Sequence, residues 1–224
     1  MCSGLSADDL AMAYPTLFHM AAEGSWPLIE RLGLLSTSAL LDCFEVPEAV
    51  RSALEERHRP NSVSIHHPTY GQAIIRDQKP MDDRGLERAL RDGLTPRDWY
   101  RVLNAKVFFW VQRHRLEIMM KARAYQLQRK TVLYVRTAEL LRRYADRVLL
   151  AAMNTGCTKP WPHPRGINTF RPMAEYPYCE YRKKKGPEAV VELAVEGKVP
   201  DIRDLVERVE IVSPDGSVEV LVEW

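Results

Sequence analysis

The stretch "VFFWVQRHRLEIMM", residues Val107–Met120, changes character in its middle. Its first five residues, Val107–Val111, form a continuous apolar run of strand length, which is typical of a central strand covered on both faces. Polar Gln112 and three potentially cationic residues follow, and an apolar helical pattern then resumes. The stretch therefore predicts a buried strand that leads directly into an amphipathic helix.

The start of that helix carries Arg113, His114 and Arg115. Cations in a first helical turn are locally unfavourable, by roughly 0.3–1 kcal/mol each at exposed positions. An anion bound at the junction would reverse the sign, because the free backbone N–H groups and the guanidinium would act together. The alternative is that these side chains simply point into solvent, as charge runs usually do. The stretch by itself favours the solvated interpretation.

The rest of the chain predicts an α+β protein, with helices concentrated in the first half and strands in the last third. The expected helices are Pro27–Leu32, Ser36 or Ser38 to Cys43, Pro47–Arg57, Asp82–Arg91, Thr95–Leu103, a segment from Arg113 that includes Leu116, Met120 and Leu127, and Thr137–Ala145. The expected strands are Thr16–Ala22, two pieces around a turn at Thr69–Gly71, Val107–Val111, Thr131–Val135, Arg147–Ala152, Glu188–Val195, Leu205–Val212 and Ser217–Trp224. Without repeats or a visible boundary, residues 1–224 predict one domain, in which 154–178 forms a long loop.

Composition narrows the class of protein. A chain of 224 residues that is 46% hydrophobic can bury a substantial core, and its net charge is only +2. No apolar run reaches eighteen residues, which argues against a transmembrane helix and a membrane partner. The first residues lack a basic segment and include Asp8 and Asp9, which argues against a signal peptide. We therefore expect a cytoplasmic protein.

Two polar residues interrupt apolar strands. His19 lies within Leu17–Met20 and needs a polar partner there, which in the simplest case is a backbone carbonyl in the core. Glu192 interrupts "AVVELAV", where its carboxylate is desolvated unless it is paired or used chemically. Alternatively, Glu188, Glu192 and Glu196 are evenly spaced along one solvent-facing strand surface.

Basic residues gather in two places. Residues 113–130 hold six Lys or Arg side chains against one acid, and Arg182–Lys185 adds four cations beside Tyr178 and Tyr181. Such patches attract phosphate groups, and neighbouring aromatic rings can stack on bases. The alternative role is solubility. Arg76 is open to two similar interpretations, a surface ion pair with Asp77 or a phosphate contact.

Several common sites are absent from the sequence. No CxxC pair occurs, and no His or Cys residues show metal-ligand spacing, so no metal is expected. The glycine-rich phosphate loops and the nucleophile elbow of hydrolases are also missing.

Three pieces, in this order, resemble the DarT-like ADP-ribosyltransferases, toxin-type enzymes that transfer ADP-ribose from NAD. "LFHMAAEGSWPLIERLGLLS" (Leu17–Ser36) is similar to their opening strand with a histidine, followed by a helix that ends in Gly-Leu. "VFFWVQRHRLEIMM" is similar to their aromatic strand followed by an arginine, and "EAVVELAV" (Glu188–Val195) to the late strand with the catalytic glutamate. The chain also looks like a member of an uncharacterised bacterial family distantly related to them.

The resemblance implies an ADP-ribosyltransferase-like fold with a split mixed or antiparallel sheet. It assigns Glu192 as the catalytic acid, with Glu188 as a competitor, and Arg113 as the catalytic arginine. It also places His19 on the ribose or nicotinamide side of NAD. Two departures stand out: the tract from Arg113 lacks the small residue, Pro and Met of the better-known toxins, and residues 154–178 have no clear match.

The same resemblance implies that Ser25 and Ser36 line the NAD pocket. Arg76, in its interpretation as a phosphate contact, completes the expected cofactor-binding set.

The expected function is therefore an NAD-dependent ADP-ribosyltransferase, with NAD as substrate and DNA or RNA as the favoured acceptor. A protein or small-molecule acceptor, and a neutralising protein partner, are left open. The alternative is a non-catalytic nucleic-acid-binding or interaction module on a degenerate transferase fold. The enzyme hypothesis requires His19, Arg113 and Glu192 to meet in one cleft.

Overall fold

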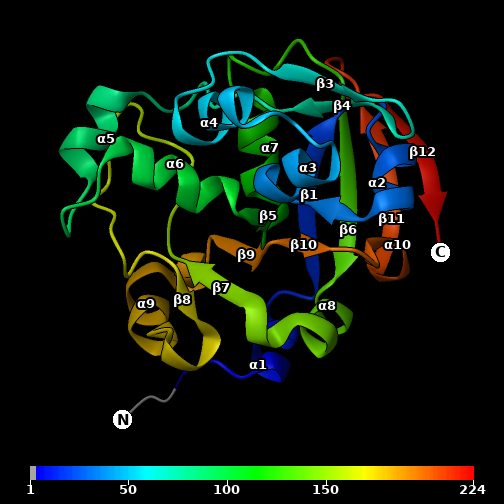
Figure 1. Ribbon diagram of the computed structural model, residues 1–224. Helices are drawn as coiled ribbons and strands as arrows, with labels where there is room; N and C mark the ends of the chain where they lie inside the picture. The colour runs from blue at the N-terminus through cyan, green and yellow to red at the C-terminus, as the bar shows by residue number, and fades with distance from the viewer. Residues whose placement is uncertain (1–3) are drawn as a thin grey trace.

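A computed structural model describes residues 4–224 and shows an α+β fold around one eight-stranded antiparallel sheet (Figure 1). The strand order is β12-β11-β6-β1-β5-β9-β7-β8. The strands are β1 Thr16–Ala22, β5 Lys106–Trp110, β6 Lys130–Arg136, β7 Val148–Ala151, β8 Arg171–Pro172, β9 Glu192–Glu196, β11 Val206–Val212 and β12 Val218–Glu223. Two small sheets pair β2 Leu34–Leu35 with β10 Lys198–Val199, and β3 Val63–His67 with β4 Gly71–Ile75. The α+β prediction is confirmed.

Helices precede most of the sheet in the chain, as the sequence predicts. They are α1 Ala7–Ala13, α2 Trp26–Leu32, α3 Thr37–Cys43, α4 Glu48–Glu56, α5 Asp83–Ala89, α6 Pro96–Asn104, α7 Arg113–Lys121, α8 Thr137–Tyr144, α9 Tyr178–Lys185 and α10 Ile202–Leu205. Local chemistry fixes their starts: Ser36 caps α3, and Thr95 with Asp98 forms a capping box on α6. Within residues 4–224, no helix is both long and apolar enough to cross a bilayer.

Among neighbouring strands of the described sheet, β1 and β5 share the fewest paired residues. Strands β1 and β6 pair along their whole lengths, from Thr16 to Ala22, and β5 pairs with all of β9. Between β1 and β5, in contrast, the only paired residues among those described are Phe18 and Trp110. The sheet therefore consists of two four-stranded halves that meet at one residue pair, and the backbone around that pair is free for other contacts.

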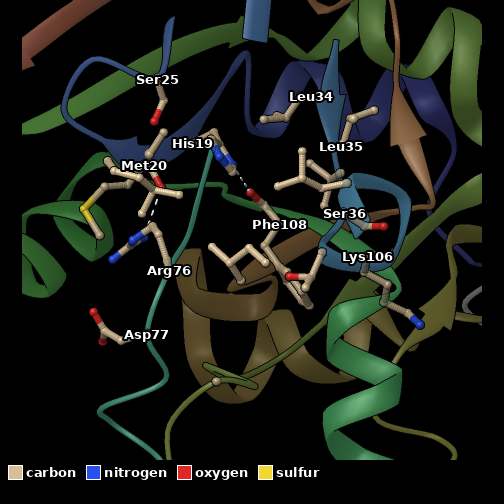
Figure 2. Close-up of a pocket in the computed structure, with 18 of the residues that line it drawn as sticks. His19, Met20, Ser25, Leu34, Leu35, Ser36, Arg76, Asp77, Lys106 and Phe108 are labelled. Atoms are coloured by element: carbon tan, nitrogen blue, oxygen red, sulfur yellow. Dashed lines mark hydrogen bonds between the residues drawn. The ribbon is translucent and has the colours of Figure 1, made fainter. Parts of the chain in front are cut away.

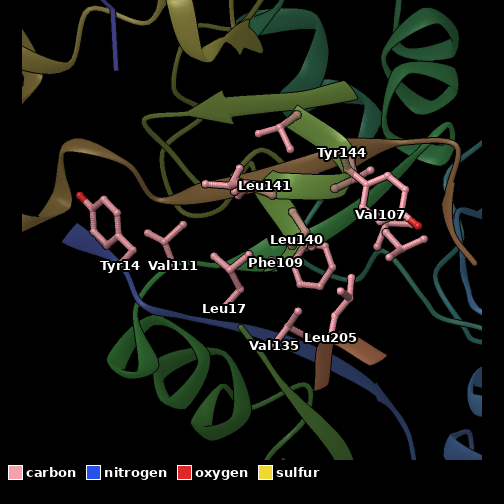
Figure 3. Close-up of a cluster of buried hydrophobic side chains, with 14 of the residues drawn as sticks. Tyr14, Leu17, Val107, Phe109, Val111, Val135, Leu140, Leu141, Tyr144 and Leu205 are labelled. Carbon is pink, nitrogen blue, oxygen red and sulfur yellow. The ribbon is translucent and has the colours of Figure 1, made fainter. Parts of the chain in front are cut away.

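One face of the sheet carries the main core (Figure 3). Alternation along β5 sends Val107, Phe109 and Val111 to this face, where Leu140 and Leu141 of α8 cover them. Phe108 and Trp110 project to the opposite face. The junction of β1 and β5 draws on both faces, because His19 alternates with Phe18 and its ring packs edge-on against Phe109.

Two predicted elements have different limits in the structure. The predicted helix through Leu127 is wrong, because α7 ends at Lys121 and Leu127 is 82% exposed, while Tyr125 is buried in its place. The predicted strand from Glu188 is also wrong at its start. Gly186, with φ 57°, and Pro187, which lacks an N–H, hold Glu188 in a 3₁₀ turn, and β9 begins only at Glu192.

Candidate active site

A cavity of about 460 Å³ lies where the two halves of the sheet meet (Figure 2). Its size falls in the roughly 300–1,000 Å³ range of small-molecule sites. Strand β1, helix α2, the start of α3, the segment after β4, the end of α6 and β5 all contribute to its wall. The last part of the wall comes from residues 154–156 and Glu192. Segments far apart in the sequence therefore converge here.

His19 projects from β1 into this cavity and is held in one tautomer. Its Nδ1 lies 2.8 Å from the carbonyl oxygen of Phe108 across the narrow junction. Since a carbonyl only accepts, Nδ1 carries the hydrogen. Burial lowers the pKa of His19 to about 4, with a contribution from nearby Arg76, so the ring is neutral at pH 7. Nε2 is then left as a hydrogen-bond acceptor.

Glu192 is a buried carboxyl at the first residue of β9, 5% exposed. Its Oε2 accepts hydrogen bonds from the Thr155 backbone N–H at 3.1 Å and from the Thr155 hydroxyl at 2.6 Å. Burial raises the pKa of Glu192 to about 7, although the Thr155 bonds and the charges of Arg165 and Arg115 oppose the rise. Both bonds use Oε2, so Oε1 remains available to a ligand.

Strand register fixes the spacing of these two groups. Trp110 pairs with Phe18 on one side and with Glu192 on the other. Two strand spacings separate the backbones of Phe18 and Glu192, which is about 10 Å. His19 follows Phe18 and therefore leaves the strand toward the opposite face of the sheet. The lining of one cavity nevertheless includes both His19, which accepts, and Glu192, whose pKa lies near neutrality. The surface interpretation of Glu192 is wrong.

Arg165 holds in place the loop whose Thr155 binds Glu192. This arginine is 2% exposed and donates to the carbonyls of Thr155 and Cys157, both at 2.7 Å, and of His163 at 3.1 Å. Neither Thr155 nor Arg165 was predicted as a site residue. The long loop was expected to be functional, but no periodicity identifies which of its residues turn inward.

The predicted cofactor-binding residues Ser25, Ser36 and Arg76 all line the cavity (Figure 2). The Ser25 side chain makes no capping bond at the start of α2, whereas Ser36 caps α3 through the Ala39 N–H. Arg76 donates to the Met20 carbonyl at 3.0 Å, and burial lowers its pKa. Figure 2 shows Ser25 on the side of Arg76, and Ser36 on the opposite side.

Arg113 is not brought to this cavity. Its side chain is 59% exposed and pairs with Glu117 one turn later on α7, with Nε 3.0 Å from Oε1. The two following side chains contact an acid within the chain, because Glu188 accepts hydrogen bonds from His114 and Arg115. The predicted meeting of Arg113 with His19 and Glu192 therefore does not occur. Glu188 lies outside the cavity lining as well.

A second cavity of about 770 Å³ is lined in part by Asn154 and Cys157 of the same loop. Asn154 lines both cavities. The second one has six cationic residues and a single acid, Asp92, and its edge includes Trp161, which is 80% exposed. The cations are Arg91, Arg115, Lys159, Arg165, Arg171 and Lys185.

Metal-ligating side chains do not cluster in the part of the chain that the structure describes. Within residues 4–224, no group of three or more His, Cys, Asp or Glu is arranged to hold a metal ion. The expectation of metal-independent chemistry stays a prediction.

Fold and site together define an antiparallel α+β protein with a buried carboxyl and a neutral histidine in one cavity at a sheet junction. The chain belongs to the family of unknown function DUF7002, whose model matches residues 15–206. The matched segment contains His19, Arg76, Thr155 and Glu192. No curated protein matches the chain.

Proposed function

We propose that the protein is an NAD-dependent ADP-ribosyltransferase. The observation that carries the proposal is the placement of Glu192, a buried carboxyl with a pKa of about 7, in one cavity with the neutral acceptor His19. The cavity fits a dinucleotide chemically, because it offers a hydroxyl acceptor, a carboxylate and buried cations. Arg76 replaces Arg113 as the arginine of the site. Arg59 also lines the cavity, but its guanidinium is held by the carbonyls of Arg76 and Leu54 and by the Asn104 side chain.

Each residue has a definite task in the proposed reaction. Breaking the bond between nicotinamide and ribose leaves the electron pair on nicotinamide and develops positive charge on the ribose, much as in glycoside cleavage. Ionised Glu192 stabilises that charge and takes the proton of the incoming nucleophile. His19 Nε2 accepts a hydrogen bond from a ribose hydroxyl and so orients the sugar.

The pKa of Glu192 suits this role. A general base works best when its pKa lies near the working pH, and a carboxyl with an ordinary pKa would be a weaker base. The Thr155 bonds keep the carboxyl in one orientation and leave Oε1 for the substrate. Activity should therefore rise with pH through about 7.

The second cavity supports a nucleic acid as the acceptor. Three cations of its lining, Arg91, Arg171 and Lys185, form no ion pair within residues 4–224 and can attract phosphates. Exposed Trp161 offers a surface on which a base can stack. This cavity adjoins the loop that holds Glu192, since Asn154 lines both cavities. DNA or RNA is accordingly the acceptor that we propose.

The test uses NAD labelled in its adenine, incubated with the protein and with single-stranded DNA, RNA or protein acceptors. Label transfer or nicotinamide release is expected for the wild type. Glu192→Gln should lower the rate roughly 10²–10⁴-fold. The matched control is Glu196→Gln, at the exposed far end of the same strand, which should retain the rate. A binding module without chemistry would bind oligonucleotides but leave NAD intact.

A further inference from the structure

A cluster of cations surrounds the buried ring of Tyr125 at one side of the cavity. Arg76 Cζ lies 5.4 Å from the ring centroid, Lys130 Nζ 5.2 Å and Lys79 Nζ 6.0 Å. The Tyr125 hydroxyl donates to Asp77 Oδ1 at 2.7 Å. We call these five residues the Tyr125 cluster. It contains three cations and one carboxylate.

The described part of the chain does not balance these charges. Within residues 4–224, neither Arg76 nor Lys130 forms an ion pair: Arg76 donates to the Met20 carbonyl, and Lys130 to the Gln128 side-chain amide. Lys79 Nζ is 3.9 Å from Asp77, which is also the acceptor for Tyr125. Unbalanced buried cations are costly, so an external anion would stabilise the cluster.

The pKa of Lys130 reflects this excess of positive charge. The residue is 5% exposed, and burial together with the charges of Arg76 and Lys79 lowers its pKa to about 8, although Asp77 opposes the shift. The strands on either side place Ala22 and Val212 opposite Lys130, and neither residue is charged.

We propose that the Tyr125 cluster binds the pyrophosphate of a dinucleotide. Arg76, Asp77 and Tyr125 line the same cavity as His19 and Glu192, so phosphates held here would leave the rest of the molecule in that cavity. The planar guanidinium of Arg76 matches the geometry of phosphate oxygens, and Lys130 adds a charge behind it. The inference rests on the proposed function only for the identity of the molecule that carries the phosphates.

Binding should be measured by isothermal titration calorimetry with inorganic pyrophosphate and with ADP-ribose. Lys130→Met removes the charge and keeps the apolar stem, and it should weaken both affinities roughly tenfold. Lys79→Met should also weaken both affinities. It provides the test of the cluster if Lys130→Met, at a buried position, folds poorly. Lys121→Met, at the exposed end of α7, is the matched control and should bind like the wild type.

Proton uptake provides a second signature. A bound anion raises the pKa of Lys130 from about 8, so the complex formed at pH 8 with ADP-ribose, whose phosphates are already fully ionised, should take up protons. Titrations in two buffers with different ionisation enthalpies measure that uptake. It should persist in Lys121→Met and disappear in Lys130→Met.

Three outcomes decide the inference separately from the proposed function. Failure of the wild type to bind pyrophosphate, or equal affinity and proton uptake in Lys130→Met, would overturn the inference even if nicotinamide is released. Pyrophosphate binding that depends on Lys130, without any nicotinamide release, would support the inference and defeat the proposed function.

Discussion

Replacing Glu192 by Gln should stabilise the protein at alkaline pH but not at acid pH. Burial raises the pKa of Glu192 from the ordinary 4.5 to about 7. Because the folded state prefers the neutral carboxyl, wild-type stability falls as pH rises from 4.5 through 7. The difference in pKa lowers the free energy of unfolding of the wild type by about 3 kcal/mol, and this loss is complete above about pH 8. Gln does not ionise, and its carbonyl oxygen can still accept both Thr155 bonds.

The assay is urea unfolding, followed by circular dichroism at pH 4.5, 6 and 8. Effects of all other groups cancel in the difference between the variant and the wild type. Glu196→Gln controls for the loss of a carboxylate from the same strand. A free-energy difference for Glu192→Gln that stays the same from pH 4.5 to 8 would refute the account of Glu192 as a desolvated acid.

Three further predictions concern the same cavity. Because the pKa of His19 is lowered from 6.5 to about 4, its contribution to stability is present above pH 6.5 and is lost as pH falls through 4. In urea unfolding, the wild type should lose about 3 kcal/mol more unfolding free energy than His19→Gln when the pH is lowered from 7 to below 4. Thr155→Val removes one hydrogen bond that lowers the pKa of Glu192, so the rising limb of the pH–rate profile should move up by roughly one unit. Arg76→Ala should weaken NAD binding roughly tenfold or more in a fluorescence titration, because Arg76 lines the cavity. Arg113→Ala should change NAD binding less than about twofold, because Arg113 pairs with Glu117 at the surface. Equal effects of the two arginine variants would contradict the assignment of Arg76.

Local patterns in the sequence predict most of the elements. Thr16–Ala22 is a strand with the predicted limits, and helix α2 ends at Gly33, whose φ of 86° suits a residue without a side chain. These features depend on neighbouring residues, which the sequence displays directly. The helix start at Arg113 was also predicted, but the direction of its side chain was not.

The site depends on contacts between distant segments, and here prediction was less complete. His19 and Glu192 were identified because polar residues stand out in apolar strands, and the structure places both in one cavity. The resemblance assigns Arg113 by its position after an aromatic strand, yet Glu117 one turn later pairs with it at the surface. The hydrogen bonds from Thr155 to Glu192 were not predicted, because Thr155 lies in a loop whose sequence has no periodic pattern.

Release of nicotinamide from NAD tests the central claim most directly. The wild-type protein should release nicotinamide, with a rate that rises through about pH 7, and Glu192→Gln should lose roughly 10²–10⁴-fold of that rate while remaining folded. A wild-type protein that leaves NAD intact with every acceptor, or a Glu192→Gln variant as fast as the wild type, would contradict the account.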